Sequence, residues 1–533
     1  MARRLNILLL LILLVNPDPP RFLLPSKALP EVLYRLTLAY QLAWIGLLFL
    51  GVGIIFVHRR QYWTDWQALI RGEARIVENQ TEAARTIGLV GVGLAVAVFI
   101  INHLYLWWII PAKLSIDGPS YLDMALQWLS ARNFAGYHFR TPGYPLFLSL
   151  FLNHQGALNL SALAMVQTLM LIVAAVMFYY GLVYLFRFKR GLAWLASLMI
   201  FSLFPLAALS KLAATETLAL FLMTGLMVLH FILAAKKAPV LFGLEGALCG
   251  LLALVRPQFY FVAFLMFLGH AAKKQWKGAA VFLVAAAVLQ GGWVWRNLTA
   301  YHLPYPASAV ALGYREQIVD PELCRHLDFG PQADPAQVET LRHSAAQDDR
   351  EQRLGEIVDS AIRGQWEQDP KSQEARTIQY LKATLLTAFR TTEGRRTYLR
   401  LVLRNVWVNL GIGSGYWESP AAVQVSEHHP AYWYLFGESL PKALYGLNPW
   451  LFIITSVIVL YAAFQVVVGK NDEQDLLPVI LLWSIIAVNA VLCALGDVPV
   501  SPRYGIGVVV LYPWLYLLAG RLVLTVIRKK LEK

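Results

Sequence analysis

The sequence predicts an all-α polytopic membrane protein with about eleven transmembrane helices, external juxtamembrane helices and a small helical external segment. Three observations lead to this prediction. Hydrophobic residues make up 58% of the 533 residues and charged residues only 15%, which is too apolar for a soluble protein of this length. Apolar runs long enough to cross a bilayer as helices recur along the chain. Basic clusters fall on alternate connections between these runs.

The apolar runs give the positions of the predicted spans. We expect transmembrane helices near residues 36–57, 87–110, 161–186, 191–209, 213–235, 241–255, 258–272, 277–295, 447–469, 476–495 and 505–526. The spans 241–255 and 258–272 are short, and Arg256-Pro257 lies between them, where proline cannot continue a helix. This pattern predicts a hairpin whose tip lies at or in the outer leaflet.

The basic residues orient the predicted spans. Lys and Arg cluster at residues 59–85, 187–190, 236–237, 273–277 and 528–530. The positive-inside rule places these clusters in the cytoplasm. The same orientation puts residues 111–160, the connections near Lys211 and Arg256, the segment 296–446 and the turn 497–504 on the external face.

The spans divide the chain into three parts. Residues 1–295 form a transmembrane core that contains the first external loop, 111–160. Residues 296–446 form an external, mostly helical cap, in which DPAQ at 334–337 and DPKS at 369–372 are typical helix starts. Residues 447–533 form the C-terminal transmembrane helices. The apolar run Ile7–Val15 has no small-residue cleavage site after it, so we expect an uncleaved helix in or on the membrane.

Composition and motifs argue against several classes of protein. The formal net charge of +13 comes from clusters that meet anionic lipid headgroups, so nucleic-acid binding is not expected. The three cysteines are scattered, which predicts neither a disulfide framework nor a zinc site. No glycine-rich phosphate loop is present, so no nucleotide site is expected. No internal repeat is evident, which counts against a transporter built from repeats.

The stretch PSYLDMALQWLSARN, residues 119–133, predicts an amphipathic helix. Tyr121, Met124, Ala125 and Trp128 are spaced as one apolar stripe, which we expect to lie against lipid at the outer surface. Asp117 precedes this helix and has two interpretations. It is either a helix cap before a proline, or a general base held at the outer leaflet for a hydroxyl group.

Four cations from separate segments converge on the external face of the predicted topology: Arg140, Lys211, Arg256 and Arg503. An anionic ligand such as a lipid phosphate would explain their convergence. Simpler roles stay open, because Arg140 could extend to lipid headgroups and Lys211 could pair with Glu216. Glu216 could itself complement the dipole of the helix that it begins.

These motifs, taken in order, resemble the membrane-embedded glycosyltransferases of the GT-C superfamily. The resemblance is carried by IDGPSYLDMALQWL at 116–129, RTPGYPLFLSLF at 140–151, Thr215-Glu216, ALVRP at 253–257, WVWRNLTAYHLPYPAS at 293–308 and PRYGIG at 502–507. It extends over about residues 85 to 526. The chain is most similar to bacterial relatives of the protein O-mannosyltransferases and of the lipid A aminoarabinose transferase.

The resemblance implies the GT-C fold and an inverting hexosyl- or pentosyltransferase. Such an enzyme takes a sugar from a polyprenyl-phosphate carrier and transfers it to a lipid-linked glycan, a polysaccharide or a protein hydroxyl. It implies a monomer in the bacterial inner membrane, with the active site facing the periplasm. Asp117 would be the catalytic base. Arg140, Arg256, Arg503 and Lys211 would bind the donor phosphate, and the substrate pocket would contain Tyr121, Tyr144, Glu216, Arg296 and Tyr504.

One departure from the family pattern bears on metal binding. Many members carry two adjacent acidic residues in the first external loop, whereas here Gly118 follows Asp117 and the next carboxylate is Asp123, on another helical face. We therefore expect transfer without a metal ion or other cofactor.

Two other classes of function remain as alternatives. One is a polysaccharide polymerase or ligase that uses polyprenyl-diphosphate substrates. The other is a flippase or transporter for lipid-linked sugars, which should carry ionisable groups near the middle of the membrane. Most charges here lie at span ends, and Glu245 is the main exception.

Overall fold

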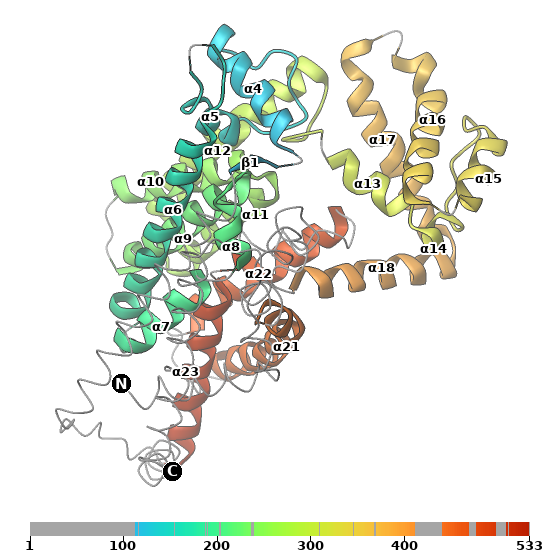
Figure 1. Ribbon diagram of the computed structural model, residues 1–533. Coiled ribbons are helices and arrows are strands. Elements are labelled where there is room, and N and C mark those ends of the chain that lie inside the picture. Colours follow the sequence, from blue (N-terminus) through green and yellow to red (C-terminus); the bar gives the residue numbers. More distant parts are fainter. Residues whose placement is uncertain are drawn as a thin grey trace, which may run out of the picture.

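The computed structural model describes residues 112–115, 117–153, 155–186, 188, 190–201, 204–235, 239–308, 310–344, 346–366, 369–410, 440–467, 476–496, 508–509 and 511–531. This part of the chain is 81% helical with almost no strand, which confirms the all-α class (Figure 1). The predicted N-terminal helix, the spans 36–57 and 87–110, and the turn with Arg503 and Tyr504 lie outside the described residues.

The predicted spans within the described residues coincide with helices. These are α6 (Leu160–Tyr180), α7 (Arg190–Phe201), α8 (Phe204–Leu209), α9 (Thr215–Ala235), α10 (Pro239–Val255), α11 (Tyr260–Ala272), α12 (Trp276–Tyr301), α21 (Leu440–Val467), α22 (Leu476–Gly496) and α23 (Leu511–Leu531). A π-helical turn, Gly181–Leu185, continues α6. Among the described helices, five are long and apolar enough to cross a membrane: Leu160–Leu185, Thr215–Leu233, Trp276–Tyr301, Leu447–Phe464 and Leu476–Leu495.

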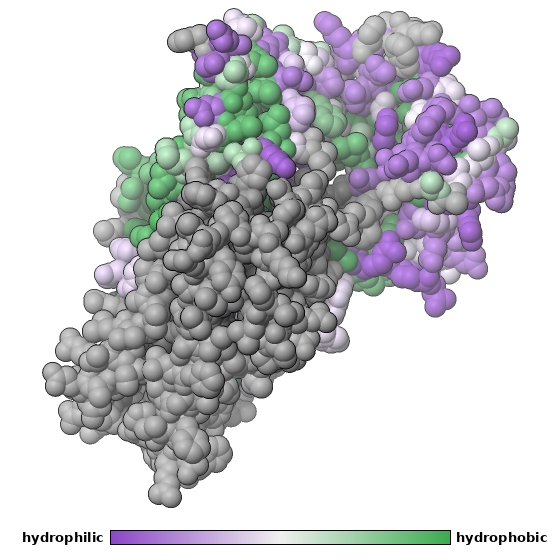
Figure 2. All heavy atoms as spheres, in the orientation of Figure 1, coloured by the Kyte–Doolittle hydropathy of each residue, from purple (hydrophilic) through white to green (hydrophobic). Residues whose placement is uncertain are grey.

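Several of these helices expose large apolar side chains. Val173 and Val176 on α6, Val284 and Val288 on α12, and Val457 on α21 are all exposed by 46% or more. Figure 2 shows hydrophobic residues gathered over α10 and its neighbours, whereas the face formed by the α15 to α17 region is mostly hydrophilic. Contiguous apolar surface of this kind suits contact with lipid chains, and the molecule is compatible with an integral membrane protein.

The predicted span 191–209 corresponds to α7 and α8, and residues 202–203 between them lie outside the described residues.

A two-stranded parallel sheet joins distant segments at one end of the bundle. β1 (Lys113–Leu114) pairs with β2 (Leu212–Ala213), and the Ser115 hydroxyl donates a hydrogen bond of 2.8 Å to the Ala213 carbonyl. β1 leads into α4 (Gly118–Ala131) and β2 leads into α9. The start of α4 is thereby held beside the start of α9, and we call this end of the bundle the α4 end.

The short helix α5 (Gly143–Ser149) packs directly on the last turn of α10. A Cβ atom at Gly143 would lie 2.7 Å from the carbonyl carbon and oxygen of Leu254. Only glycine permits this approach, because backbone atoms cannot move aside as a flexible side chain can. α10 then ends at Val255, and the 3-10 turn Pro257–Phe259 leads into α11, which confirms the predicted break at Arg256-Pro257.

The α13–α18 segment, residues 310–410, forms a helical layer beside the bundle. It contains α13 (Val310–Ile318), α14 (Pro321–Cys324), α15 (Pro335–His343), α16 (Gln347–Trp366), α17 (Gln373–Leu386) and α18 (Thr392–Leu410). A separate apolar cluster that includes Leu341, Ile357 and Leu381 holds these helices together. Both predicted helix starts are confirmed: Asp334 caps α15, and a 3-10 turn at Pro370–Ser372 leads into α17.

Substitution of Gly143 by alanine tests the contact between α5 and α10. We expect Gly143→Ala to destabilise the protein by roughly 1–3 kcal/mol, because the new methyl group must displace the backbone of α10. The matched control is Gly291→Ala in α12, where no atom lies within 4 Å of the added Cβ. The control should be neutral or slightly stabilising, since alanine favours helix more than glycine does. Unfolding of the detergent-solubilised protein measures both, and equal stabilities would contradict the contact.

Candidate functional site

Asp117 and Arg140 form an ion pair at the α4 end. The Arg140 Nη2 atom lies 2.6 Å from the Asp117 Oδ1 atom, and the two side chains are 18% and 21% exposed. Asp117 occupies the N-cap position of α4, yet its side chain makes no capping hydrogen bond. The carboxylate is therefore directed to a cation rather than to the helix, which argues against the capping interpretation, and the role of general base stays a prediction.

Glu216 and Arg256 form a second, more deeply buried pair. The Arg256 Nη1 atom lies 3.5 Å from the Glu216 Oε1 atom, and the side chains are 6% and 3% exposed. Glu216 lies in the first turn of α9, and Arg256 occupies the break between α10 and α11. Charges removed from water are strongly destabilising unless they are paired, so this pair fixes the two helix ends relative to one another.

Tyr121 and Tyr144 connect the two ion pairs. Their rings meet edge to face at 5.2 Å, and the Arg140 guanidinium lies 5.2 Å from the centre of the Tyr121 ring. Burial raises the pKa of Tyr121, and the charges that act on it are those of the two ion pairs, Arg140 with Asp117 and Glu216 with Arg256. Burial also raises the pKa of Tyr144, with Glu216 adding to the effect. The two carboxylates and two arginines are therefore neighbours of a single pair of buried aromatic side chains.

Lys211 is buried in the connection between α8 and β2. Its ammonium group donates a hydrogen bond of 3.2 Å to the Thr168 hydroxyl on α6, and the residue is 3% exposed. Burial lowers its pKa to about 7. Its backbone carbonyl also accepts from the Lys113 amide at 3.0 Å, so Lys211 lies beside the sheet that positions Asp117.

Arg296, near the end of α12, contacts the loop that follows α4. Its guanidinium donates to the carbonyl groups of Phe134 and Tyr137 and lies against the rings of Trp293 and Tyr301. These contacts hold the connection between Asp117 and Arg140 in place. The assignment of Arg296 to the substrate pocket stays a prediction.

The apolar stripe of α4 corrects one expectation. Tyr121, Met124 and Ala125 are buried inside the protein, and Trp128 stacks on Phe134 at 5.2 Å. The prediction that this stripe lies against lipid was therefore wrong. Periodicity shows which face of a helix is apolar, but it cannot distinguish burial against lipid from burial against α5. Asp123 is exposed on the opposite face.

Gln167 is a positioning residue that the sequence analysis did not single out. Its amide nitrogen donates to the carbonyl groups of Ser210 and Leu212 at 3.0 and 2.8 Å, and its oxygen accepts from the Tyr144 hydroxyl at 3.3 Å. This one side chain therefore joins α6 to β2 and to α5. The sequence signal that could have identified Gln167 is a polar amide inside the apolar run of α6.

Comparison of the chain with protein-family models, with curated proteins and with solved structures found no match. A function must therefore be argued from the side chains themselves. The site combines two arginines, which suit a phosphate group, with a partly exposed carboxylate, which can accept a proton from a hydroxyl.

The buried pair can be tested by a double-mutant cycle. Arg256→Gln should destabilise the protein by roughly 3–5 kcal/mol, because it leaves the Glu216 charge buried without this partner. Adding Glu216→Gln should restore part of that loss. The control is Arg353→Gln, which breaks an exposed pair with Glu356 in α16 and should cost less than about 1 kcal/mol. Strictly additive effects of the two substitutions would contradict a coupled pair.

Proposed function

We propose that the protein is an inverting glycosyltransferase with the GT-C fold and about eleven spans, which uses a polyprenyl-phosphate sugar at the external face of the membrane. It transfers one sugar to a lipid-linked glycan, a polysaccharide or a protein hydroxyl, in the bacterial inner membrane with the site facing the periplasm. The proposal is supported most by the meeting of Asp117, Arg140, Glu216 and Arg256 around Tyr121. The order of the sequence motifs supports it independently.

In this proposal, Asp117 accepts the proton of the acceptor hydroxyl as the oxygen attacks the anomeric carbon. The bond between the anomeric carbon and the phosphate oxygen breaks on the opposite face, which inverts the configuration. The negative charge that develops on the departing phosphate is stabilised by arginines placed before the reaction. Arg140 and Arg256 take this role, together with Lys211 and Arg503, and Tyr504 joins the substrate pocket.

The two ion pairs have different roles in this proposal because their side chains differ in exposure to solvent. The pair of Asp117 and Arg140 is partly open to solvent, so an arriving phosphate can draw the Arg140 guanidinium toward itself. The Asp117 carboxylate then loses its cation and becomes a better proton acceptor, so that donor binding activates the base. The pair of Glu216 and Arg256 is nearly inaccessible, so Arg256 would act from a fixed position.

One observation favours the transporter alternative, since Glu245 is buried inside the apolar helix α10. Its partners are His230 and His270, which form a compact cluster with it.

A polymerase or ligase would differ in its donor, a polyprenyl diphosphate in place of a monophosphate. Donor chemistry therefore distinguishes the enzyme classes.

The role of Asp117 is tested by comparing Asp117→Asn with the wild type on a polyprenyl-monophosphate sugar as donor. We expect transfer to fall on the order of 10²–10⁴-fold, because the amide cannot accept the proton. Asp123→Asn is the matched control, since Asp123 is exposed on the other face of α4, and it should transfer at the wild-type rate. Undiminished transfer by Asp117→Asn, with unchanged unfolding, would remove Asp117 from the mechanism.

The pKa of Lys211 predicts a pH dependence of donor binding. With a pKa of about 7 in the free protein, the ammonium is charged below that pH and loses its proton above it. A bound phosphodiester favours the charged form, so the donor should bind more weakly as the pH rises above 7. The probe is a polyprenyl-phosphate sugar, whose own charge is constant in this range. Lys211→Met should abolish this dependence, and an unchanged pH profile in the variant would contradict the role.

A further inference from the structure

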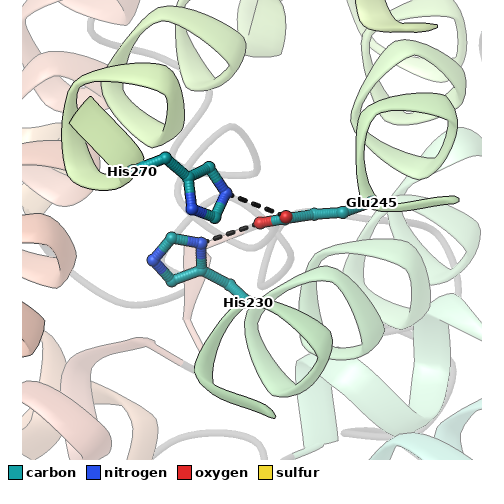
Figure 3. Close-up of side chains that lie close together, drawn as sticks. All are labelled: His230, Glu245 and His270. Carbon is teal, nitrogen blue, oxygen red and sulfur yellow. Dashed lines mark hydrogen bonds and ion pairs between the residues drawn. The ribbon is translucent and has the colours of Figure 1, made fainter. Parts of the chain in front are cut away.

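Three polar side chains meet inside the bundle, at the end opposite the α4 end. His230 belongs to α9, Glu245 to the second turn of α10 and His270 to the last turn of α11, and Figure 3 shows both imidazole rings directed at the carboxylate. The His230 Nδ1 atom lies 2.7 Å from Glu245 Oε1, and the His270 Nε2 atom lies 2.9 Å from Glu245 Oε2. His230 lies about 20 Å along α9 from Glu216, at the helical rise per residue. The cluster is therefore separate from the candidate transfer site.

The surroundings of the cluster are apolar. The three residues are 2%, 0% and 0% exposed, and the rings of Phe242 and Phe282 lie 4.9 and 5.6 Å from that of His270. A carboxylate so far from water is strongly destabilising unless a positive charge compensates it. A metal ion held by the carboxylate and both imidazoles would supply that charge.

Gln275, at the N-cap of α12, lies beside the ring nitrogen of His270 that faces away from Glu245. Its side-chain oxygen lies 3.3 Å from His270 Nδ1, and its backbone N–H donates to the His270 carbonyl at 3.0 Å. A neutral imidazole that donates to this oxygen through Nδ1 has its lone pair on Nε2, the nitrogen beside Glu245 Oε2, and this is the tautomer that a metal ligand requires. A histidine that ligates a metal typically has the same outer hydrogen bond.

We propose that His230, Glu245 and His270 bind a divalent first-row transition metal ion of the zinc class. The three ligand atoms lie within 4.8 Å of one another. In a tetrahedral zinc site with bonds of 2.0–2.1 Å, neighbouring ligand atoms are about 3.3 Å apart. Small side-chain movements would bring the three ligand atoms to these separations. Two histidines and a carboxylate are a ligand set that such ions prefer.

The proposed ion is structural, because it links α9, α10 and α11 away from the transfer site. α9 and α10 carry Glu216 and Arg256 at their other ends, so the ion would fix the helices that position that pair. The proposal does not depend on the proposed function. It also leaves the expectation of metal-independent transfer untouched, since that expectation concerns the carboxylates of the first external loop.

The test is the metal content of the full-length protein, purified in detergent with a tag that contains no histidine and without chelator. Elemental mass spectrometry should find a stoichiometric amount of zinc or another first-row metal. Glu245→Gln keeps the shape of the side chain but removes its charge, and it should lose the metal. Cys249→Ala, one turn further along α10 and equally buried, is the control and should retain it. Gln275→Leu should weaken metal affinity by roughly 10–100-fold, as loss of an outer hydrogen bond does.

A second measurement covers the case in which Glu245→Gln does not fold. Wild-type protein reconstituted with Co²⁺ should show the visible bands of a low-symmetry site with nitrogen and oxygen ligands, and no thiolate charge-transfer band from Cys249. Folded wild-type protein that contains no metal and takes up neither Zn²⁺ nor Co²⁺ would overturn the proposal in favour of a proton shared within the cluster. Full metal content in folded Glu245→Gln would overturn it as well.

Discussion

The buried ion pair between Glu216 and Arg256 is the constraint on which the α4 end depends. Neither charge can return to water without opening the bundle, so the start of α9 and the end of α10 must stay together. The contact of Gly143 with the Leu254 backbone places α5 against the same turn of α10. The pairing of β1 with β2 then places the start of α4 beside the start of α9. The first two of these contacts would be lost if α10 did not end where it does.

This arrangement explains how one site can contain both a fixed and an adjustable charge. Arg256 is held by Glu216 in an enclosed position, whereas Arg140 and Asp117 are exposed enough to change partners. The Tyr121 ring lies against the Arg140 guanidinium and the Tyr144 ring, and the charges of both pairs act on it. The low polarity around Tyr121 and Tyr144 strengthens the interaction of any bound anion with the arginines. In the proposed function, this anion is the phosphate of the lipid-linked donor.

The local features of the fold could be predicted from the sequence. The lengths of the apolar runs predicted the positions of α6, α9, α12 and α22. The Arg256-Pro257 dipeptide predicted the break after α10. Both signals depend only on residues that are neighbours in the sequence.

Pairings between distant residues could not be predicted in the same way. The partners of Asp117 and Glu216, the two-residue strands and the cluster of His230, Glu245 and His270 all depend on segments that meet only in the folded bundle. The sequence predicted that Arg140 and Arg256 converge, and in the structure the charges of both act on Tyr121. No sequence signal indicated which acid each arginine contacts. The roles of Arg503 and Tyr504 stay predictions, since both lie outside the described residues.

The central claim is that the α4 end binds a polyprenyl-phosphate sugar. Native mass spectrometry of the protein released from its own membranes tests this claim most directly, because the mass of the bound lipid gives the length of the carrier, the number of its phosphates and the class of the sugar. The account predicts a polyprenyl monophosphate that carries one sugar, bound to the wild type and lost from Arg140→Ala. A bound polyprenyl diphosphate, or the same lipid retained by that variant, would contradict it.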